Sequence, residues 1–220
     1  LKAAKASCPD TRLQVTLGYP VLALEKIRAL APYVDVFCPN ECYFGSAEHM
    51  KFFQEFKAQG KAFWVYACGT ATRVSLYKYY RFQAWRAWYH GAQVAGLFRY
   101  LSGPGGHYGR EAWKCEAGGA VAYNSLGAPV SSIRYEALRE GFDDIKYLAK
   151  LRDVLDAAKT KADKDRPDAQ LLQAAESFLQ RVAEEVVVKL PHQEGRAEAA
   201  RQQAARLILE LQGAMAGGGR

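Results

Sequence analysis

The sequence predicts an α/β fold: a partial TIM (β/α)8-type barrel with about five parallel strands, followed by a C-terminal helical extension. Between residue 13 and about residue 125, short apolar runs rich in β-branched and aromatic residues alternate with amphipathic stretches. This alternation is typical of β-α-β units around a parallel sheet. After Pro129 the patterns are helical. A complete eight-stranded barrel needs roughly 250 residues, so the missing strands are expected from upstream sequence, from another copy of the chain, or not at all.

The alternating segments predict the following elements in chain order. Strands are expected at Leu13–Leu17, Val34–Cys38, Ala62–Ala67, Gly96–Leu101 and Ala120–Asn124. Helices are expected between them at Ala23–Ala31, Ala47–Gln59 and Ser75–His90. In the second of these helices Met50, Phe53 and Phe56 recur at helical spacing, and Gly60 follows where a left-handed cap belongs. We expect that apolar face to pack on the sheet.

The third helix is rich in aromatic residues. It mixes tyrosines and the tryptophans Trp85 and Trp88 with Lys78, Arg81 and Arg86. One interpretation is that these rings stack on nucleic-acid bases. The favoured interpretation is a barrel helix, which must cover strands on one flank and neighbouring helices on the other, and is therefore aromatic over most of its circumference.

The C-terminal part of the chain predicts helices. Ser131 and Ser132 introduce a long helix, whose apolar stripe comprises Leu138, Phe142, Ile145, Leu148 and Leu155. Two more helices are expected, one after Pro167 and one at Ala199–Leu211, with the short β-prone segment Val186–Val188 between them. We therefore divide the chain into a barrel portion at residues 1–158, a helical extension at 159–216 and a disordered tail at 217–220.

The charge pattern argues against a nucleic-acid partner. The formal net charge is +7, but basic and acidic residues alternate along stretches such as Lys146–Arg152 and Arg196–Arg206, which is typical of a solvated helix face. No nucleic-acid motif accompanies the charge. No apolar run reaches the roughly 18 residues needed to span a bilayer. The chain begins at Leu1 without a leader, so we expect it to be processed or to be a fragment.

The five cysteines form an odd set without C-x-x-C pairs: Cys8, Cys38, Cys42, Cys68 and Cys115. Most are expected to be buried thiols. Alternatively, Cys38 and Cys42 could form a bridge or share a metal if the turn between them brought their side chains together. The favoured expectation is that the protein holds no metal ion and no cofactor.

One long string carries a specific resemblance. Residues 132–151 read SIRYEALREGFDDIKYLAKL, and matching features precede them in the same order, among them Asp35–Pro39, Gly60–Lys61, Arg81 with Trp85, and Gly96–Tyr100. The string resembles the pattern that closes the catalytic region of glycoside hydrolase family 123 and its uncharacterised relatives. The resemblance covers roughly residues 5–155, and it implies the C-terminal half of a β-N-acetylgalactosaminidase-like domain.

The resemblance also implies a mechanism. In that family the acetamido oxygen of the sugar itself attacks the anomeric carbon, while an aspartate orients the acetamido group and an adjacent glutamate acts as acid and base. This chain contains no Asp-Glu dipeptide. The pair is therefore expected upstream, and these residues alone are expected to be inactive. The nearest substitute is Asn40-Glu41, which follows the strand Val34–Cys38 and places Glu41 at the mouth of the barrel. The alternative is that Glu41 is a solvated loop carboxylate.

Candidate sugar-binding residues lie at or just after the expected strand ends, because sugar pockets pair flat aromatic rings with hydrogen-bonding groups. They are Tyr66, Tyr100, Trp113 and Tyr123. Each could instead fill the barrel or its lid. Arg134, in the first turn of the long helix, is also expected to approach the pocket. The Arg139-Glu140 and Asp143-Asp144 pairs are expected to form ion pairs that tie this helix to neighbouring loops.

Three departures from the family pattern put the substrate in doubt. Tyr100 stands where a tryptophan is common, Gly118 where an aspartate is common, and Asn124 where a proline is common. They support an alternative function, a non-catalytic carbohydrate-binding or structural scaffold module derived from the barrel. The expected partners are a glycan and the remainder of the barrel, and the C-terminal helices are a candidate surface for a protein partner. Family resemblance implies a secreted or vesicular location.

Overall fold

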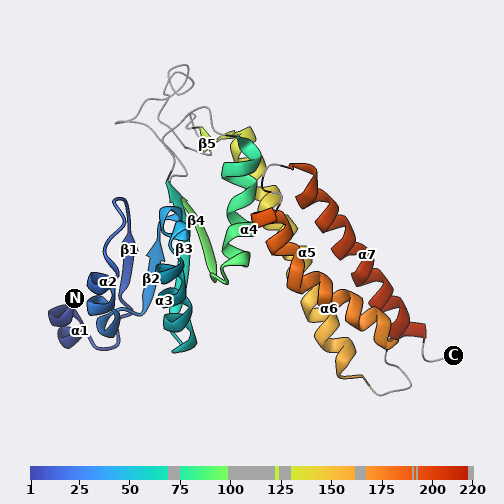
Figure 1. The fold of residues 1–220 in the computed structure, drawn as a ribbon, viewed down its shortest axis with the longest axis horizontal. Helices are drawn as coiled ribbons and strands as arrows, with labels where there is room; N and C mark the ends of the chain where they lie inside the picture. The colour runs from blue at the N-terminus through green and yellow to red at the C-terminus, as the bar shows by residue number, and fades with distance from the viewer. Residues whose placement is uncertain are drawn as a thin grey trace. The chain divides into compact units, whose positions relative to one another are not determined.

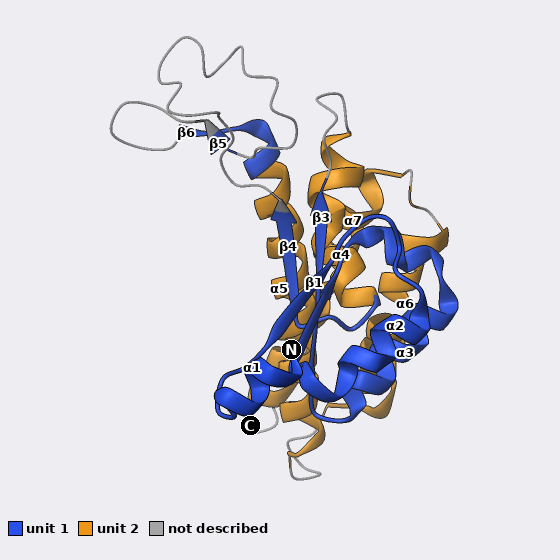
Figure 2. Ribbon diagram, turned by 90° about the vertical axis from the view of Figure 1, so that its left-hand side faces the viewer, with its two compact units in different colours: residues 1–74, 90–135 blue, residues 75–89, 136–220 orange. Residues whose placement is uncertain are grey.

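The computed structural model describes residues 1–68, 75–98, 122–123, 130–161, 167–189, 191 and 193–217. The chain forms two compact units, which are coloured separately in Figure 2. Unit 1 comprises residues 1–74 and 90–135, and unit 2 comprises residues 75–89 and 136–220. This division by proximity does not test the domain boundaries predicted at residues 158 and 216, which stay predictions.

Unit 1 contains a four-stranded parallel sheet (Figure 1). Its strands are β1 (Gln14–Leu17), β2 (Val36–Pro39), β3 (Ala62–Cys68) and β4 (Val94–Phe98), paired in that order. Each neighbouring pair is parallel, with Thr16 opposite Cys38 and Tyr66 opposite Gly96. The first four predicted strands are therefore confirmed, and the α/β class with them. The described strands do not establish a complete TIM barrel.

The prediction of a fifth parallel strand at Ala120–Asn124 is wrong for its described part. There β5 (Ala122–Tyr123) pairs antiparallel with β6 (Val130–Ser131) in a separate two-stranded sheet. The physical reason is the length of the connection between them. Residues 124–129 can join antiparallel neighbours, whereas a parallel crossover takes a dozen or more residues.

The helices of unit 1 are α1 (Lys2–Ser7), α2 (Leu24–Leu30) and α3 (Ala47–Ala58), with 3-10 turns η1 (Ala31–Tyr33) and η2 (Glu41–Gly45). Of these, α1 was not predicted. Ser46 caps α3 by accepting a hydrogen bond from the His49 amide, and Gly60 takes the expected left-handed conformation after its end.

The predicted apolar face of α3 packs on the sheet. Phe53 is fully buried, its ring lies 5.2 Å from that of Phe63 on β3, and the two planes are nearly parallel. Phe56 lies 4.8 Å from Phe37 on β2 by ring centroids. Because alternate residues of a strand face opposite sides, Phe37 and Phe63 mark the side of the sheet that faces α3.

The Asp35 carboxylate forms hydrogen bonds at the amino-terminal edge of the sheet. Asp35, directly before β2, accepts hydrogen bonds from the Leu13 amide at 2.8 Å and from Lys5 Nζ at 2.9 Å. The backbone bond from Leu13, followed by the bond from Lys5, holds the pKa of Asp35 below its ordinary value. This ion pair therefore ties α1 to the start of the first two strands.

Unit 2 is helical. A π-helical turn, η3 (Leu76–Arg81), leads into α4 (Phe82–Tyr89), and the chain later forms α5 (Ile133–Lys159), α6 (Ala169–Glu184), η6 (Glu185–Lys189) and α7 (Gly195–Gly217). The β-prone segment Val186–Val188 is thus helical. The core of the unit joins Trp85 to leucines of α5 and α7, including Leu148, Leu151 and Leu211, all fully buried.

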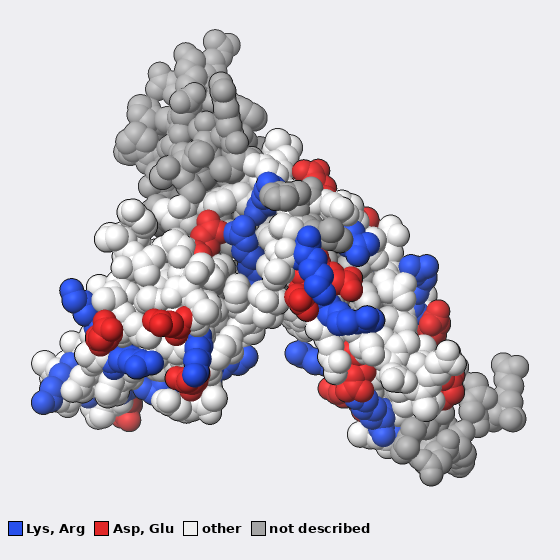
Figure 3. Space-filling model, in the orientation of Figure 1, with Lys and Arg blue, Asp and Glu red and all other residues white. Residues whose placement is uncertain are grey.

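Buried rings characterise the aromatic helix, and charges of both signs characterise the surface of unit 2. Trp85 and Tyr80 are fully buried, so neither ring is available for stacking on bases. On the face shown in Figure 3, positive and negative side chains are interspersed over the helices of unit 2. Ion pairs such as Lys159 with Glu176, 3.0 Å apart, account for part of this mixture. None of the described helices is long and apolar enough to cross a membrane.

Candidate functional site

The carboxyl edge of the sheet in unit 1 brings together segments that follow three strands. The strands are parallel, so their carboxyl ends meet at one edge, where α/β sheets usually bind ligands. Asn40, after β2, donates its backbone N–H to Leu17 O of β1 at 2.8 Å and forms a parallel bridge with Tyr66 of β3. The residues directly after Leu17 are Gly18 and Tyr19. These contacts bring Asn40 beside Tyr66, and a Cβ atom built on Gly18 would lie 3.5 Å from the Tyr66 hydroxyl oxygen.

The Asn40 side chain has a fixed orientation. It is buried, at 8% exposure, and its Oδ1 accepts a hydrogen bond from the Cys42 amide at 3.1 Å. Asn40 is thereby the N-cap of η2. The Asn40 side chain also acts on the neighbouring Tyr66 hydroxyl, whose pKa it lowers.

Tyr66 keeps its proton at neutral pH. Burial raises the pKa of its hydroxyl above the ordinary value of 10, and hydrogen bonding with Asn40 opposes this shift only in part. Tyr66 lies on the face of the sheet opposite Phe63 and α3, because residues 63 and 66 differ by an odd number along β3. Its neighbour across the sheet is Gly96 of β4, which adds no side chain beside the ring.

Glu41, the predicted substitute acid, lies at the carboxyl edge as expected. It is the first residue of η2, directly after Asn40, and it is half-buried. The structure therefore brings Glu41 and Tyr66 to the same edge. The catalytic role of Glu41 stays a prediction.

The remaining predicted sugar ligands are less fully described. Tyr100 and Trp113 lie outside the described residues, as does the side chain of Tyr123, whose backbone belongs to β5. Arg134 is half-buried in the first turn of α5. The Ser132 hydroxyl caps that turn by accepting the Arg134 amide at 3.1 Å.

The cysteines differ from expectation. Of the four described, only Cys38 is buried, whereas Cys8 and Cys68 are exposed and Cys42 is intermediate. The prediction that most are buried is therefore wrong for the described part of the chain, because Cys8 and Cys68 stand at the ends of elements. Cys38 and Cys42 are both free thiols, so they do not form the bridge considered as an alternative. Burial raises the pKa of Cys38 to about 11, which keeps that thiol protonated.

Unit 2 contains a second polar cluster, centred on a buried carboxylate. Asp144 on α5 is fully buried and accepts two hydrogen bonds from Arg81, each 2.8 Å, and one from Trp85 Nε1 at 2.9 Å. Burial raises the pKa of Asp144, and the bonds from Arg81 and Trp85 oppose that shift. The bidentate geometry is the strong form of an arginine–carboxylate pair.

The cluster continues to α7. Arg201 donates to Glu140 and to Glu198, each at 2.6 Å, and Glu198 also accepts from Arg81 at 3.2 Å. Oxygens of Glu140, Asp144 and Glu198 lie within 4.8 Å of one another, a spacing that could hold a metal ion. Each of these carboxylates already pairs with a guanidinium, so the cluster fits an arginine-bridged network. Of the residues expected to tie this helix to neighbouring loops, Glu140 and Asp144 instead pair with arginines of other helices, Arg201 and Arg81. Arg139 and Asp143 pair only within α5 among the described ion pairs, so for these two the expectation is wrong.

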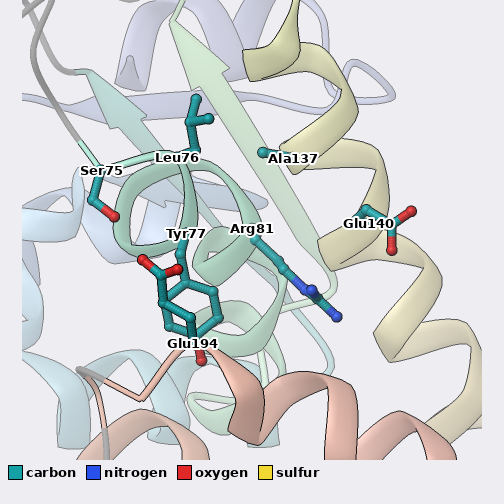
Figure 4. A pocket seen from close by; sticks show the side chains of 7 residues that line it. All are labelled: Ser75, Leu76, Tyr77, Arg81, Ala137, Glu140 and Glu194. Atoms are coloured by element: carbon teal, nitrogen blue, oxygen red, sulfur yellow. The ribbon is translucent and has the colours of Figure 1, made fainter.

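A hollow of about 440 Å³ opens beside this network in unit 2 (Figure 4). Its lining comprises Ser75, Leu76, Tyr77, Arg81, Ala137, Glu140 and Glu194. Arg81 is committed to Asp144 and Glu198. The hollow thus offers a ligand mainly two carboxylates and an apolar wall, and it lacks an aromatic ring with an exposed face, since Tyr77 is only 6% exposed.

The sequence analysis placed Tyr66 and the pair Asn40-Glu41 at this edge but did not single out Gly18 and Tyr19. The signal was present: Gly18 and Tyr19 directly follow the expected strand Leu13–Leu17, as Asn40 follows the next strand. The rule that selected Tyr66, position at a strand's carboxyl end, selects them equally.

Comparison with solved structures finds a distant likeness. The chain is similar to a family 123 glycoside hydrolase from Clostridium perfringens, whose structural analysis concerned glycolipid glycan hydrolysis. The TM-score is 0.51 at 12% sequence identity, and the match covers 92% of this chain and 40% of that one. This chain therefore spans well under half of the protein that it matches. The likeness shows a related fold. No protein-family model matches the chain, and no curated protein does.

Proposed function

We propose that this chain is part of a glycoside hydrolase-like protein that acts on N-acetylhexosamine-containing glycans by substrate-assisted hydrolysis. The observation that carries the proposal is the likeness of fold to a family 123 glycoside hydrolase over 92% of this chain. The resemblance of residues 132–151 to the pattern of that family agrees with it. In this proposal the chain supplies later strands of the barrel and its C-terminal helices.

The chemistry of the carboxyl edge supports a sugar ligand. Sugars present hydroxyl groups and apolar C–H faces, and they need hydrogen-bonding groups beside aromatic rings. The edge offers the Tyr66 hydroxyl, the Asn40 amide and the Glu41 carboxylate in neighbouring positions. We assign Tyr100, Trp113, Tyr123 and Arg134 to the same pocket as further ligands.

The catalytic Asp-Glu pair is assigned to upstream sequence, because no Asp-Glu dipeptide occurs in these residues. The test compares the 220 residues alone, a version extended upstream to include an Asp-Glu pair, and that version with the pair replaced by Asn-Gln. Only the second should hydrolyse a chromogenic N-acetylgalactosaminide. Hydrolysis by the 220 residues alone that is lost in Glu41→Gln would instead place the acid within this chain, and inactivity of the extended protein on such substrates would refute the proposal.

A second candidate function is a non-catalytic carbohydrate-binding or scaffold module derived from the barrel. The missing dipeptide and the departures at Tyr100, Gly118 and Asn124 favour it. Glycan binding by an extended protein that does not hydrolyse the glycan would support this function. An Asp-Glu pair after an upstream apolar strand, with hydrolysis that depends on it, would exclude it.

A further inference from the structure

Helix α7 carries an exposed leucine on its outer face. Leu209 is 68% exposed, whereas Leu207 and Leu211, two positions before and after it, are buried in the core of unit 2. Buried and exposed positions thus lie on opposite faces of this helix. A single exposed leucine is common on protein surfaces, so the surface beside Leu209 decides whether it has a partner.

The surface beside Leu209 is hollowed. A hollow of about 600 Å³ lies between α5 and α7, and its lining includes Tyr147, Gln202 and Ala205. Ala205 lies one helical turn before Leu209, on the same face of α7. Its side chain is small, and the Tyr147 ring is 42% exposed. The hollow therefore offers open apolar surface close to Leu209.

The charged part of the lining is already satisfied. Lys146 Nζ lies 2.8 Å from an Asp143 carboxylate oxygen. Arg201 lies 2.6 Å from both Glu140 and Glu198. With Arg139, the lining holds three cations and three carboxylates, so it has no net charge. Such a hollow has no net attraction for an ion, and its uncommitted surface fits an apolar side chain.

Arg206 and Glu210 provide opposite charges on the same helix. Both are exposed, and neither forms an ion pair with another described residue. They lie on one flank of Leu209, one turn apart. In an antiparallel pair of α7 helices that sets Leu209 against Ala205 of a second copy, Glu210 lies opposite position 204 of that copy. It is then two residues, or about 3 Å along the helix axis, from Arg206 there.

We propose that two copies of this chain associate through antiparallel α7 helices, with Leu209 of each copy inserted into the hollow of the other beside Ala205 and Tyr147. The occupant is a second copy because one surface supplies both halves of the contact, the projecting leucine and the hollow, together with charges that complement themselves about a two-fold axis. Such an isologous contact closes on itself, so association stops at the dimer. The inference is independent of the proposed function, since it involves none of the predicted sugar ligands.

The test is sedimentation equilibrium of the whole 220-residue chain at concentrations from about 10 μM to about 1 mM, the range in which small interfaces dissociate. The parent chain should show a monomer–dimer equilibrium without larger species. Leu209→Ala should weaken the dimer about tenfold or more, because each dimer loses two buried leucines. Val188→Ala shortens another exposed apolar side chain of unit 2, at 51% exposure, and as the matched control it should dimerise as the parent does.

A charge exchange tests the antiparallel arrangement. In Arg206→Glu the flank of each copy becomes wholly acidic, and in Glu210→Arg it becomes wholly basic. Each variant alone should therefore dimerise about tenfold more weakly through like-charge repulsion. An equimolar mixture of the two should form a mixed dimer at least as readily as the parent, because every contact on the flank then joins opposite charges. A contact within one chain would not be restored by mixing two chains.

Three results would overturn the inference: a parent chain that stays monomeric at the highest concentration, a dimer unaffected by Leu209→Ala, or variants of opposite charge that do not associate on mixing. Circular dichroism checks the folding of each variant. All three substituted side chains are exposed, so folding should be retained. If Leu209→Ala nevertheless fails to fold, the mixing experiment decides alone.

Discussion

The substitution Gly141→Ala tests how unit 2 is packed. Gly141 is buried in α5, and a Cβ atom there would lie 2.1 Å from Arg81 O, 2.9 Å from Arg81 C and 3.0 Å from Arg81 Cα. These are backbone atoms, so no side-chain rotation can relieve the contact. Either α5 or η3 must move, and a movement of Arg81 would also disturb its two bonds to Asp144.

The magnitude follows from two opposing effects. Alanine favours a helix over glycine by about 1 kcal/mol, whereas forcing an extra group into a packed interior costs about 1–3 kcal/mol and sometimes more. Because backbone atoms lie on both sides of the contact, we expect the packing cost to reach the upper end of its range, about 3 kcal/mol. Subtracting the helix preference of about 1 kcal/mol leaves a net loss of about 2 kcal/mol in the free energy of unfolding. For a chain of this size that corresponds to a fall of about 4–8 °C in Tm.

The assay is thermal and urea unfolding followed by circular dichroism, with Gly213→Ala as the matched control. Gly213 lies in α7, and apart from its own stretch of helix a Cβ atom there would have no heavy atom within 4 Å. Gly213→Ala should therefore raise the stability by up to about 1 kcal/mol. If Gly141→Ala were as stable as the parent chain or more stable, the close approach of α5 to Arg81 would be refuted.

Three further predictions concern stability. Asp144→Asn leaves Arg81 buried beside a neutral group and should lower the free energy of unfolding, measured in urea, by about 3–5 kcal/mol. Asp143→Asn, at the neighbouring and more exposed position, should lower it by about 1 kcal/mol or less. Equal effects of the two variants would contradict the buried network. Phe53→Ala should cost about 3–5 kcal/mol, since it empties the space between α3 and the sheet, and a loss below about 1 kcal/mol would contradict that packing. The pKa of Asp35 is lower in the folded state than in the unfolded state, so its ion pair should stabilise the protein above about pH 4. This contribution should be lost as the pH falls further, and the difference in stability between the parent and Asp35→Asn should shrink in the same range. A difference in stability that does not depend on pH would refute the assignment.

The fold was predictable where a local pattern carried it. The strands β1 to β4 are short apolar runs, and the face of α3 repeats at helical spacing, so each could be predicted from neighbouring residues alone. The strand at Ala122–Tyr123 was predicted as a strand but given the wrong partner. Strand propensity does not distinguish parallel from antiparallel pairing, and the two-residue partner Val130–Ser131 is too short to have a pattern of its own.

The burial of the Asp144 carboxylate could not be predicted from the sequence, for a different reason. Asp144 lies in a helix rich in charged residues, where the sequence predicted ion pairs with neighbouring loops but did not predict a buried carboxylate. Its burial depends on Arg81 and Trp85, which are 63 and 59 positions away in the chain. No spacing rule connects residues on different helices across that distance. The resemblance placed Arg81, Trp85 and residues 132–151 in one pattern, but it did not show that they touch.

The two edges of the sheet in unit 1 differ in how their polar side chains are engaged, which predicts different effects of substitution at each edge. At the amino edge, Asp35 and Lys5 are fully engaged with each other and with the backbone. At the carboxyl edge, Asn40 accepts the Cys42 amide, and Tyr66, the predicted sugar ligand, is half-buried. Barrel enzymes usually place binding groups at the carboxyl ends of their strands and groups that serve stability at the amino ends. Asp35→Asn should therefore lower the free energy of unfolding without changing saccharide affinity, while Tyr66→Phe should lower affinity and leave stability within about 1 kcal/mol of the parent. If both variants changed both quantities together, the two edges would not act independently, and loss of binding in Tyr66→Phe could be ascribed to a loss of structure.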